Sequence, residues 1–153
     1  AGMGLAKAAQ VKAAFELGKR LAASTEGPRP VVSKAADAAT LVMEDLRYRE
    51  QECIAAILLD ARNQVIRVPI ISIGTLTGSP AHPREIFREA ITHGAHTIIV
   101  VHNHPSGDPT PSPEDLLLTS RLVKAGEVNG IAVSDHIIIG GGRYVSLKAA
   151  GKM

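Results

Sequence analysis

The sequence predicts an α/β fold, in which a mixed β-sheet is flanked by helices and preceded by a helical N-terminal appendage. The chain has 153 residues, which is the length of about one domain. Its hydrophobic content of 45% and charged content of 21% are typical of a globular protein. From residue 50 onward, short apolar runs alternate with helical segments, in the order β-β-α-β-α-β-β without an internal repeat. We therefore expect a single α/β domain over residues 30–151.

The N-terminal region predicts two helices separated by a linker. Residues 5–22 are rich in Ala, Lys, Glu and Leu, with apolar residues near helical spacing. Gly27, Pro28 and Pro30 then favour a linker, because proline and glycine do not continue a helix. We expect Ser33 to cap a second helix that runs to about Leu46.

The first two strands are expected to form a hairpin. Residues 53–59 form a continuous apolar run, which is typical of a strand buried on both faces. A turn over residues 60–63 leads to a return strand over residues 65–72. Pro69 inside the return strand indicates an edge position or a bulge, because proline cannot donate a ladder hydrogen bond.

The remaining elements follow from helix-start and helix-stop residues and from β-branched runs. Pro83 suits the first position of a helix, and Ser112-Pro113 opens another with an N-cap and a proline at its first position. The expected elements are a helix over 83–94, a strand over 97–101, a helix over 113–129, a strand over 131–139, a turn over 140–142 and a strand over 143–147.

Composition and charge exclude some classes of protein. No apolar run approaches the length of a membrane span, and we expect no N-terminal signal peptide, since no charged-then-apolar pattern appears. The single Cys53 excludes an internal disulfide, so we expect a soluble, cytoplasmic protein. The net charge of +2 is uneven, with +4 on residues 1–34 and −2 on the rest. Any affinity for DNA should therefore lie in the N-terminal helical region, although a solvated helix face explains the same bias.

Two histidines at the end of a predicted strand indicate a metal site. His102 and His104 are two residues apart, so their side chains point to the same side of an extended chain. Asp115 follows at the start of a helix. Two imidazole nitrogens and one carboxylate oxygen are three of the four ligands that zinc prefers in a catalytic site. The alternative is that Asp115 only completes a capping box with Ser112 and needs no metal.

Two more residues are candidates for the chemistry around such an ion. Glu52 directly precedes a buried apolar strand and could act as the general acid and base, with Glu50 as the alternative on the same strand face. Ser112 could donate a hydrogen bond to an oxyanion. We expect the Asp135-His136 pair to be structural, because a histidine in a strand is more often a satisfied side chain than a ligand.

These residues resemble a known motif. The run His102-x-His104-Pro105, then Ser112-x-x-Asp115, with Glu52 upstream, resembles the JAMM motif of the JAB/MPN metalloproteases. The longer stretch HNHPSGDPTPSPED, with PREIFREAI before it and SDHIIIG after it, is similar to the bacterial RadC proteins. Residues 2–21 resemble the end of the helix-hairpin-helix region that precedes the RadC domain. Only half of the helix-hairpin-helix region is present, so we expect the chain to be truncated.

The resemblance implies a cytidine-deaminase-like JAB/MPN fold over residues 30–151, with residues 1–24 as a partial helix-hairpin-helix remnant. It implies one Zn²⁺ on His102, His104 and Asp115, with Glu52 as general acid and base and Ser112 as oxyanion support. The leading hypothesis is a zinc-dependent hydrolase that cleaves a peptide or isopeptide bond of an unknown protein or peptide substrate. One alternative is a DNA-associated repair protein that acts as a nuclease or recruits a partner. Another is a non-catalytic scaffold, which would require a lost ligand, and none of the five positions has lost its residue.

Overall fold

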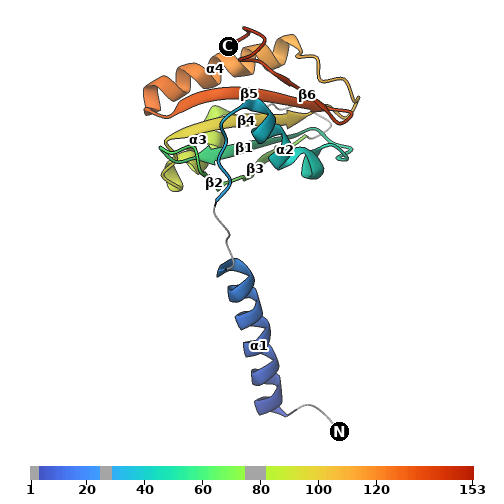
Figure 1. Ribbon diagram of the computed structural model, residues 1–153, viewed down its shortest axis with the longest axis vertical. Coiled ribbons are helices and arrows are strands. Elements are labelled where there is room, and N and C mark those ends of the chain that lie inside the picture. Colours follow the sequence, from blue (N-terminus) through green and yellow to red (C-terminus); the bar gives the residue numbers. More distant parts are fainter. Residues whose placement is uncertain (1–3, 25–28, 75–81) are drawn as a thin grey trace.

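The predicted α/β body is confirmed by the computed structural model, which describes residues 4–24, 29–74 and 82–153. A mixed six-stranded sheet has the strand order β2-β1-β4-β5-β6, and β3 also pairs with β1. Among the strands of the described residues, only β4 and β5 pair in parallel, because α4 carries the chain from one to the other (Figure 1). The elements are α1 (Leu5–Ser24), α2 (Ala35–Leu46), β1 (Cys53–Leu59), β2 (Val65–Arg67), β3 (Ile70–Ile73), α3 (Pro83–Thr92), β4 (Thr97–Asn103), α4 (Pro113–Asn129), β5 (Ala132–Gly140) and β6 (Arg143–Ser146).

The sheet lies between two helical layers, and the two-residue period of the strands divides its side chains between them. Odd-numbered residues of β1, such as Cys53 and Ile57, pack with α2 in one core cluster. Even-numbered residues, such as Ala56 and Leu58, pack with α3 and α4 in the other. All seven residues of β1 are buried, as expected for a strand covered on both faces. The continuous apolar runs in the sequence are therefore explained by helices on both sides.

Two details differ from the sequence-based expectations. The predicted return strand over residues 65–72 is two strands, β2 and β3, and Pro69 lies in the break between them. The pairing of each strand with β1 shifts register once. The predicted N-cap Ser33 is wrong by one residue, because the cap of α2 is Lys34. The Asp37 carboxylate accepts hydrogen bonds from the backbone N–H groups of both residues, at 2.9 and 3.1 Å, which is the role of the acidic residue at the third helical position of a capping box.

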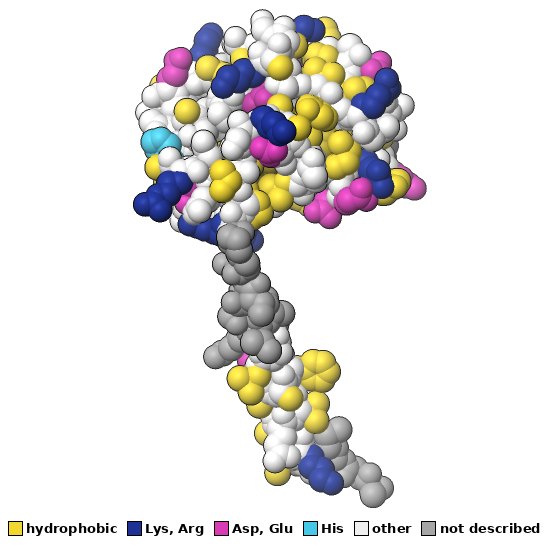
Figure 2. Space-filling model, in the orientation of Figure 1, with side chains coloured by type: hydrophobic (Ala, Val, Ile, Leu, Met, Phe, Trp, Pro, Cys, Tyr) yellow, Lys and Arg dark blue, Asp and Glu magenta, His cyan; other side chains and the backbone are white. Residues whose placement is uncertain are grey.

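The N-terminal helix α1 stands apart from the sheet in Figure 1. Its Phe15 side chain is exposed, as are Val11 and Leu17. Parts of the linker predicted over residues 24–30, and of the segment between β3 and α3, lie outside the described residues. On the face in Figure 2, Lys and Arg side chains of the sheet-containing part are spread among acidic and apolar ones. Affinity of the N-terminal region for DNA stays a prediction.

Among the described residues, no helix combines the length and the apolar character needed to cross a bilayer.

A glycine at the end of β5 allows the loop after β4 to pack against the sheet. A Cβ atom on Gly140 would lie 2.7 Å from the backbone nitrogen of Pro109 and 2.8 Å from the carbonyl carbon of Asp108. Both neighbours are main-chain atoms, which cannot rotate away. This close approach holds the segment that connects β4 to α4.

We expect Gly140→Ala to lower the free energy of unfolding by about 1–3 kcal/mol, because the added methyl group overpacks this contact. Chemical denaturation measures the loss. Gly18→Ala is the control, since a Cβ atom there meets nothing within 4 Å and alanine favours a helix. Equal stability of the Gly140→Ala variant and the parent would contradict the close approach.

Candidate metal centre

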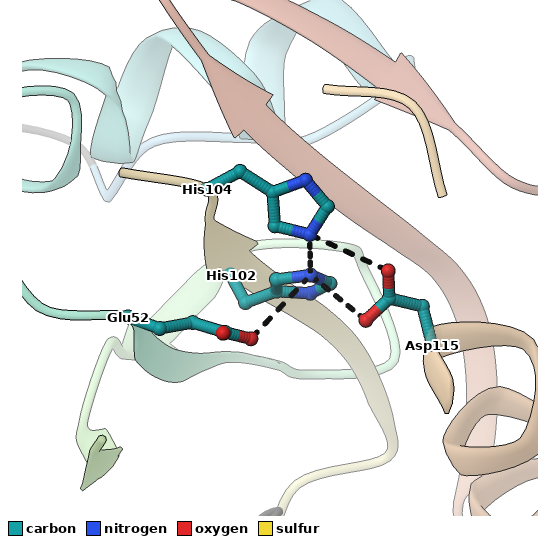
Figure 3. A group of neighbouring side chains, drawn as sticks. All are labelled: Glu52, His102, His104 and Asp115. Carbon is teal, nitrogen blue, oxygen red and sulfur yellow. Dashed lines mark hydrogen bonds and ion pairs between the residues drawn. The ribbon is translucent and has the colours of Figure 1, made fainter. Parts of the chain in front are cut away.

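Four of the five predicted site residues meet at one point. One ligand atom from each of Glu52, His102, His104 and Asp115 lies within 4.8 Å of every other. In Figure 3 the two imidazole rings and the two carboxylates turn toward a common centre. The structure therefore brings together the three predicted metal ligands and the predicted general base.

The sheet register places two of these residues beside each other. Ile54 of β1 pairs with His102 of β4, and even-numbered residues of both strands face the α3 and α4 layer. Glu52, two residues before Ile54, lies on the same side of the chain. Its backbone oxygen accepts a hydrogen bond from the N–H of Gly74 at 2.6 Å, so β3 also holds this end of β1. Glu50 is exposed and is not part of the cluster.

The first turn of α4 supplies Asp115. Its Oδ2 atom accepts a hydrogen bond from the backbone N–H of Ser112 at 2.7 Å, and the Ser112 hydroxyl accepts one from the N–H of Asp115 at 3.1 Å. The capping box considered as an alternative is therefore present. The same carboxylate also lies 3.1 Å from Nε2 of His102 and 3.4 Å from Nε2 of His104. Capping and membership of the cluster are compatible, because Oδ1 faces His102 while Oδ2 accepts the hydrogen bond from Ser112 and still lies near His104.

The cluster lies at the boundary between the core and the solvent. The His102 side chain is 1% exposed and that of Asp115 is 9% exposed, whereas the Glu52 side chain is 51% exposed. The deepest group is thus a ligand candidate, and the most accessible is the general base candidate. The centre lies at the carboxyl end of β4, where α/β folds commonly bind ligands. The centre is therefore most open to solvent on the Glu52 side.

The protons of the cluster favour a cation at its centre. Nδ1 of His104 lies 2.8 Å from the backbone oxygen of Asp108, which can only accept, so Nδ1 carries a hydrogen. In the tautomer with this hydrogen, the lone pair is on Nε2, which lies 2.9 Å from Nε2 of His102. Burial alone would raise the pKa of Asp115, but its contacts with the His102 ring and its hydrogen bonds with Ser112 hold it well below its usual range.

An ionised carboxylate and two imidazole nitrogens are a donor set that fits zinc. The residues present therefore fit the ion that the resemblance implies.

Sequence reasoning did not identify a role for Asn103, which lies between the two histidines. Its side chain points to the opposite face of β4 and is 1% exposed. Oδ1 accepts a hydrogen bond from the N–H of Cys53 at 2.8 Å, and Nδ2 donates to the oxygen of Gln51 at 3.2 Å. These bonds hold the backbone on both sides of Glu52. The sequence did offer one signal for this role, because Asn103 is a polar residue that follows an apolar run and lies between two ligand candidates.

We expect Asn103→Ala to lower the free energy of unfolding by about 1–3 kcal/mol, because the buried N–H of Cys53 loses its acceptor. Zinc content should not change, since the ligands themselves remain. Chemical denaturation and metal analysis measure the two effects. Asn129→Ala is the matched control, because this exposed amide bonds only within α4 in the described residues. Loss of zinc would show that Asn103 holds the histidines rather than Glu52.

His136 was expected to have a structural role only, but it contacts one of the cluster residues directly. Its Nε2 atom lies 2.9 Å from Nδ1 of His102, and its side chain is fully buried in the middle of β5. Burial lowers the pKa of His136 to about 3. The ring is therefore neutral at physiological pH.

The fold and the cluster together define the class of protein. A mixed sheet between helices, two histidines and an aspartate from the β4–α4 connection, and a glutamate before β1 are the features of a JAB domain with a metal-binding motif. A family model described as a RadC-like JAB domain matches residues 32–152. The chain belongs to the RadC family.

Several curated proteins are similar to the chain over nearly its whole length. The UPF0758 protein of Desulforamulus reducens is 55% identical over 150 residues, which cover 98% of this chain and 66% of that protein. The UPF0758 protein of Caldanaerobacter subterraneus subsp. tengcongensis is 51% identical, with 98% and 64% covered. That of Methanosarcina mazei is 47% identical, with 98% and 66% covered. The chain thus spans slightly less than two thirds of the length of these relatives.

Proposed function

We propose that the chain is a zinc-dependent hydrolase of the JAMM type, which uses a water molecule to cleave a peptide or isopeptide bond. The observation that carries the proposal is the convergence of Glu52, His102, His104 and Asp115 within 4.8 Å. Three of these residues form a ligand set for zinc that leaves one position open, which is typical of a catalytic rather than a structural site. The nature of the scissile bond rests on the resemblance to JAMM proteases.

In this proposal His102 and His104 hold the ion through their Nε2 atoms, and Asp115 holds it through a carboxylate oxygen. When bound, zinc supplies Lewis acidity, which makes a water molecule acidic enough to ionise near neutral pH. The burial of His102 and Asp115 fixes their positions, so little reorganisation is needed when substrate arrives.

Glu52 is the proton carrier of the proposed reaction. Its Oε1 atom lies 3.9 Å from Nε2 of His102, which is close to the centre but beyond ordinary hydrogen-bond distance. The carboxylate can accept a proton from the attacking water at Oε1 and deliver it to the leaving amine nitrogen. Its exposure allows it to contact both the water and the substrate.

Ser112 is proposed to stabilise the oxyanion that forms at the attacked carbonyl. In the capping box the Ser112 hydroxyl accepts a hydrogen bond, and none of the bonds to the described residues uses its own hydrogen. That hydrogen is available to donate. A preorganised donor of this kind stabilises a transition state more than a ground state.

Cleavage of a mixed peptide library by the purified chain, read by mass spectrometry, tests the proposal. We expect cleavage that stops when a chelator removes the metal and returns when zinc is added. The same protein is incubated with supercoiled plasmid, because a nuclease is the competing hypothesis. Metal-dependent nicking without peptide cleavage, or an intact library with zinc-loaded protein, would overturn the assignment of the bond.

A further inference from the structure

Behind the candidate metal centre, the His102 ring contacts a row of buried polar groups. Nδ1 of His102 lies 2.9 Å from Nε2 of His136, and Nδ1 of His136 lies 2.6 Å from the Thr119 hydroxyl. That hydroxyl also lies 2.6 Å from the backbone oxygen of Asp115. His102, Thr119 and His136 are each at most 1% exposed. The row therefore begins at the main chain of one ligand candidate and ends at the side chain of another.

The direction of the hydrogen bonds in this row follows from the backbone oxygen of Asp115, where the row begins. A backbone carbonyl oxygen can only accept, so the Thr119 hydroxyl donates its single hydrogen to Asp115. The hydroxyl must then accept a hydrogen bond from Nδ1 of His136. With its hydrogen on Nδ1, the fully buried ring of His136 has a lone pair on Nε2, and Nδ1–H of His102 donates to it.

The reverse direction is unfavourable. If the Thr119 hydroxyl donated to His136, its oxygen would face the Asp115 oxygen at 2.6 Å with no hydrogen between them. A reversed row would also place a hydrogen on Nε2 of a neutral His102, which is the nitrogen that points into the cluster. A histidine in that tautomer cannot bind a metal ion through Nε2.

We propose that Thr119 and His136 are positioning residues that hold His102 in its Nδ1–H tautomer and thereby raise the affinity of the centre for a divalent cation. The inference rests on the proposed function only in requiring that the centre binds metal. Partners of this kind orient a ligating imidazole, and their loss typically weakens metal binding by 10–100-fold. Because Thr119 lies one helical turn after Asp115 in α4, the same helix also aligns two ligands of the centre.

Two substitutions of Thr119 separate the hydroxyl from the shape of the side chain. Thr119→Val keeps the branched shape and removes both hydrogen bonds, whereas Thr119→Ser keeps the hydroxyl. Zinc affinity is measured by competition with a chelating dye. We expect about 10–100-fold weaker zinc binding by the valine variant and affinity within about threefold of the parent for the serine variant. Thr119→Ala provides a second variant without the hydroxyl if the valine variant does not fold.

Nitrogen-15 spectra of the imidazole rings provide a readout that a purely structural role would not change. We expect Nδ1–H signals for both His102 and His136 in the zinc-loaded parent and in Thr119→Ser, and a mixture of tautomers in the metal-free Thr119→Val variant. Parent-like zinc affinity of a folded variant without the hydroxyl would overturn the proposal, as would equal weakening by serine and valine. An Nε2–H signal for His136 in the parent would do the same.

The two proposals fail in different ways. A zinc-loaded parent chain that cleaves no peptide contradicts the hydrolase, while its zinc affinity and its imidazole tautomers still decide the role of Thr119 and His136. A parent chain that binds no zinc contradicts both proposals. A parent chain that cleaves peptides, with a Thr119→Val variant of equal zinc affinity, supports the hydrolase and contradicts the positioning role.

Discussion

Replacing Glu52 with glutamine is expected to reduce hydrolysis by at least about 100-fold while leaving about one zinc per chain, because general acid–base catalysis typically contributes 10²–10⁴-fold. Glutamine has nearly the same shape but cannot accept the proton of the attacking water. Glu52 is the most exposed member of the cluster, so the substitution should not disturb the fold. Peptide cleavage rates and metal analysis on the same preparation measure the two quantities.

Glu50→Gln is the matched control for this experiment. Glu50 lies two residues before Glu52, is also exposed, and stands outside the cluster. We expect parent-like hydrolysis from this variant. Full activity of Glu52→Gln together with loss of activity in Glu50→Gln would reverse the assignment of the general base. Loss of zinc from Glu52→Gln would instead make Glu52 a ligand.

The second large effect is expected for His104→Ala, which should lose most of the zinc that the parent binds at about one ion per chain. Removing one of three protein ligands leaves an incomplete site. The His104 side chain is 17% exposed, so its removal leaves no large buried cavity. Metal analysis of purified protein measures zinc content, and thermal unfolding shows that the variant is folded.

His96→Ala is the control for His104→Ala, because His96 is exposed and lies outside the cluster. This variant should retain the zinc content of the parent. Equal zinc in His104→Ala and the parent would contradict the metal assignment. Loss of zinc in both variants would indicate that the ion is bound adventitiously by surface histidines.

The candidate site was largely predictable because its signals are local in the sequence. His102 and His104 share a side through the two-residue period of an extended chain, and Asp115 is fixed at the third position of α4 by its capping box with Ser112. A continuous apolar run after Glu52 predicts a buried strand, and the structure has that strand with the predicted bounds. Local patterns of this kind also predict most of the element order.

The contacts that sequence reasoning missed depend on long-range pairing. His136 meets His102 because β5 pairs with β4 in a parallel register that places His136 opposite Val100. Asn103 reaches the backbone around Glu52 because β1 and β4 are neighbours, although these residues are about fifty positions apart. No local pattern specifies which strands are adjacent or in which register. Supporting residues behind a site are therefore harder to predict than the residues that line it.

The four cluster residues come from separate elements of the fold, and this affects how metal binding changes the stability of the protein. The end of β4 and the start of α4 hold the three ligand candidates in one arrangement only in the folded protein, so an unfolded chain binds the ion more weakly. By mass action, a free zinc concentration of one hundred times the dissociation constant would add about 2.7 kcal/mol to the stability of the folded state. The lifetime of the protein in a cell would then follow the supply of the ion, even in the absence of substrate.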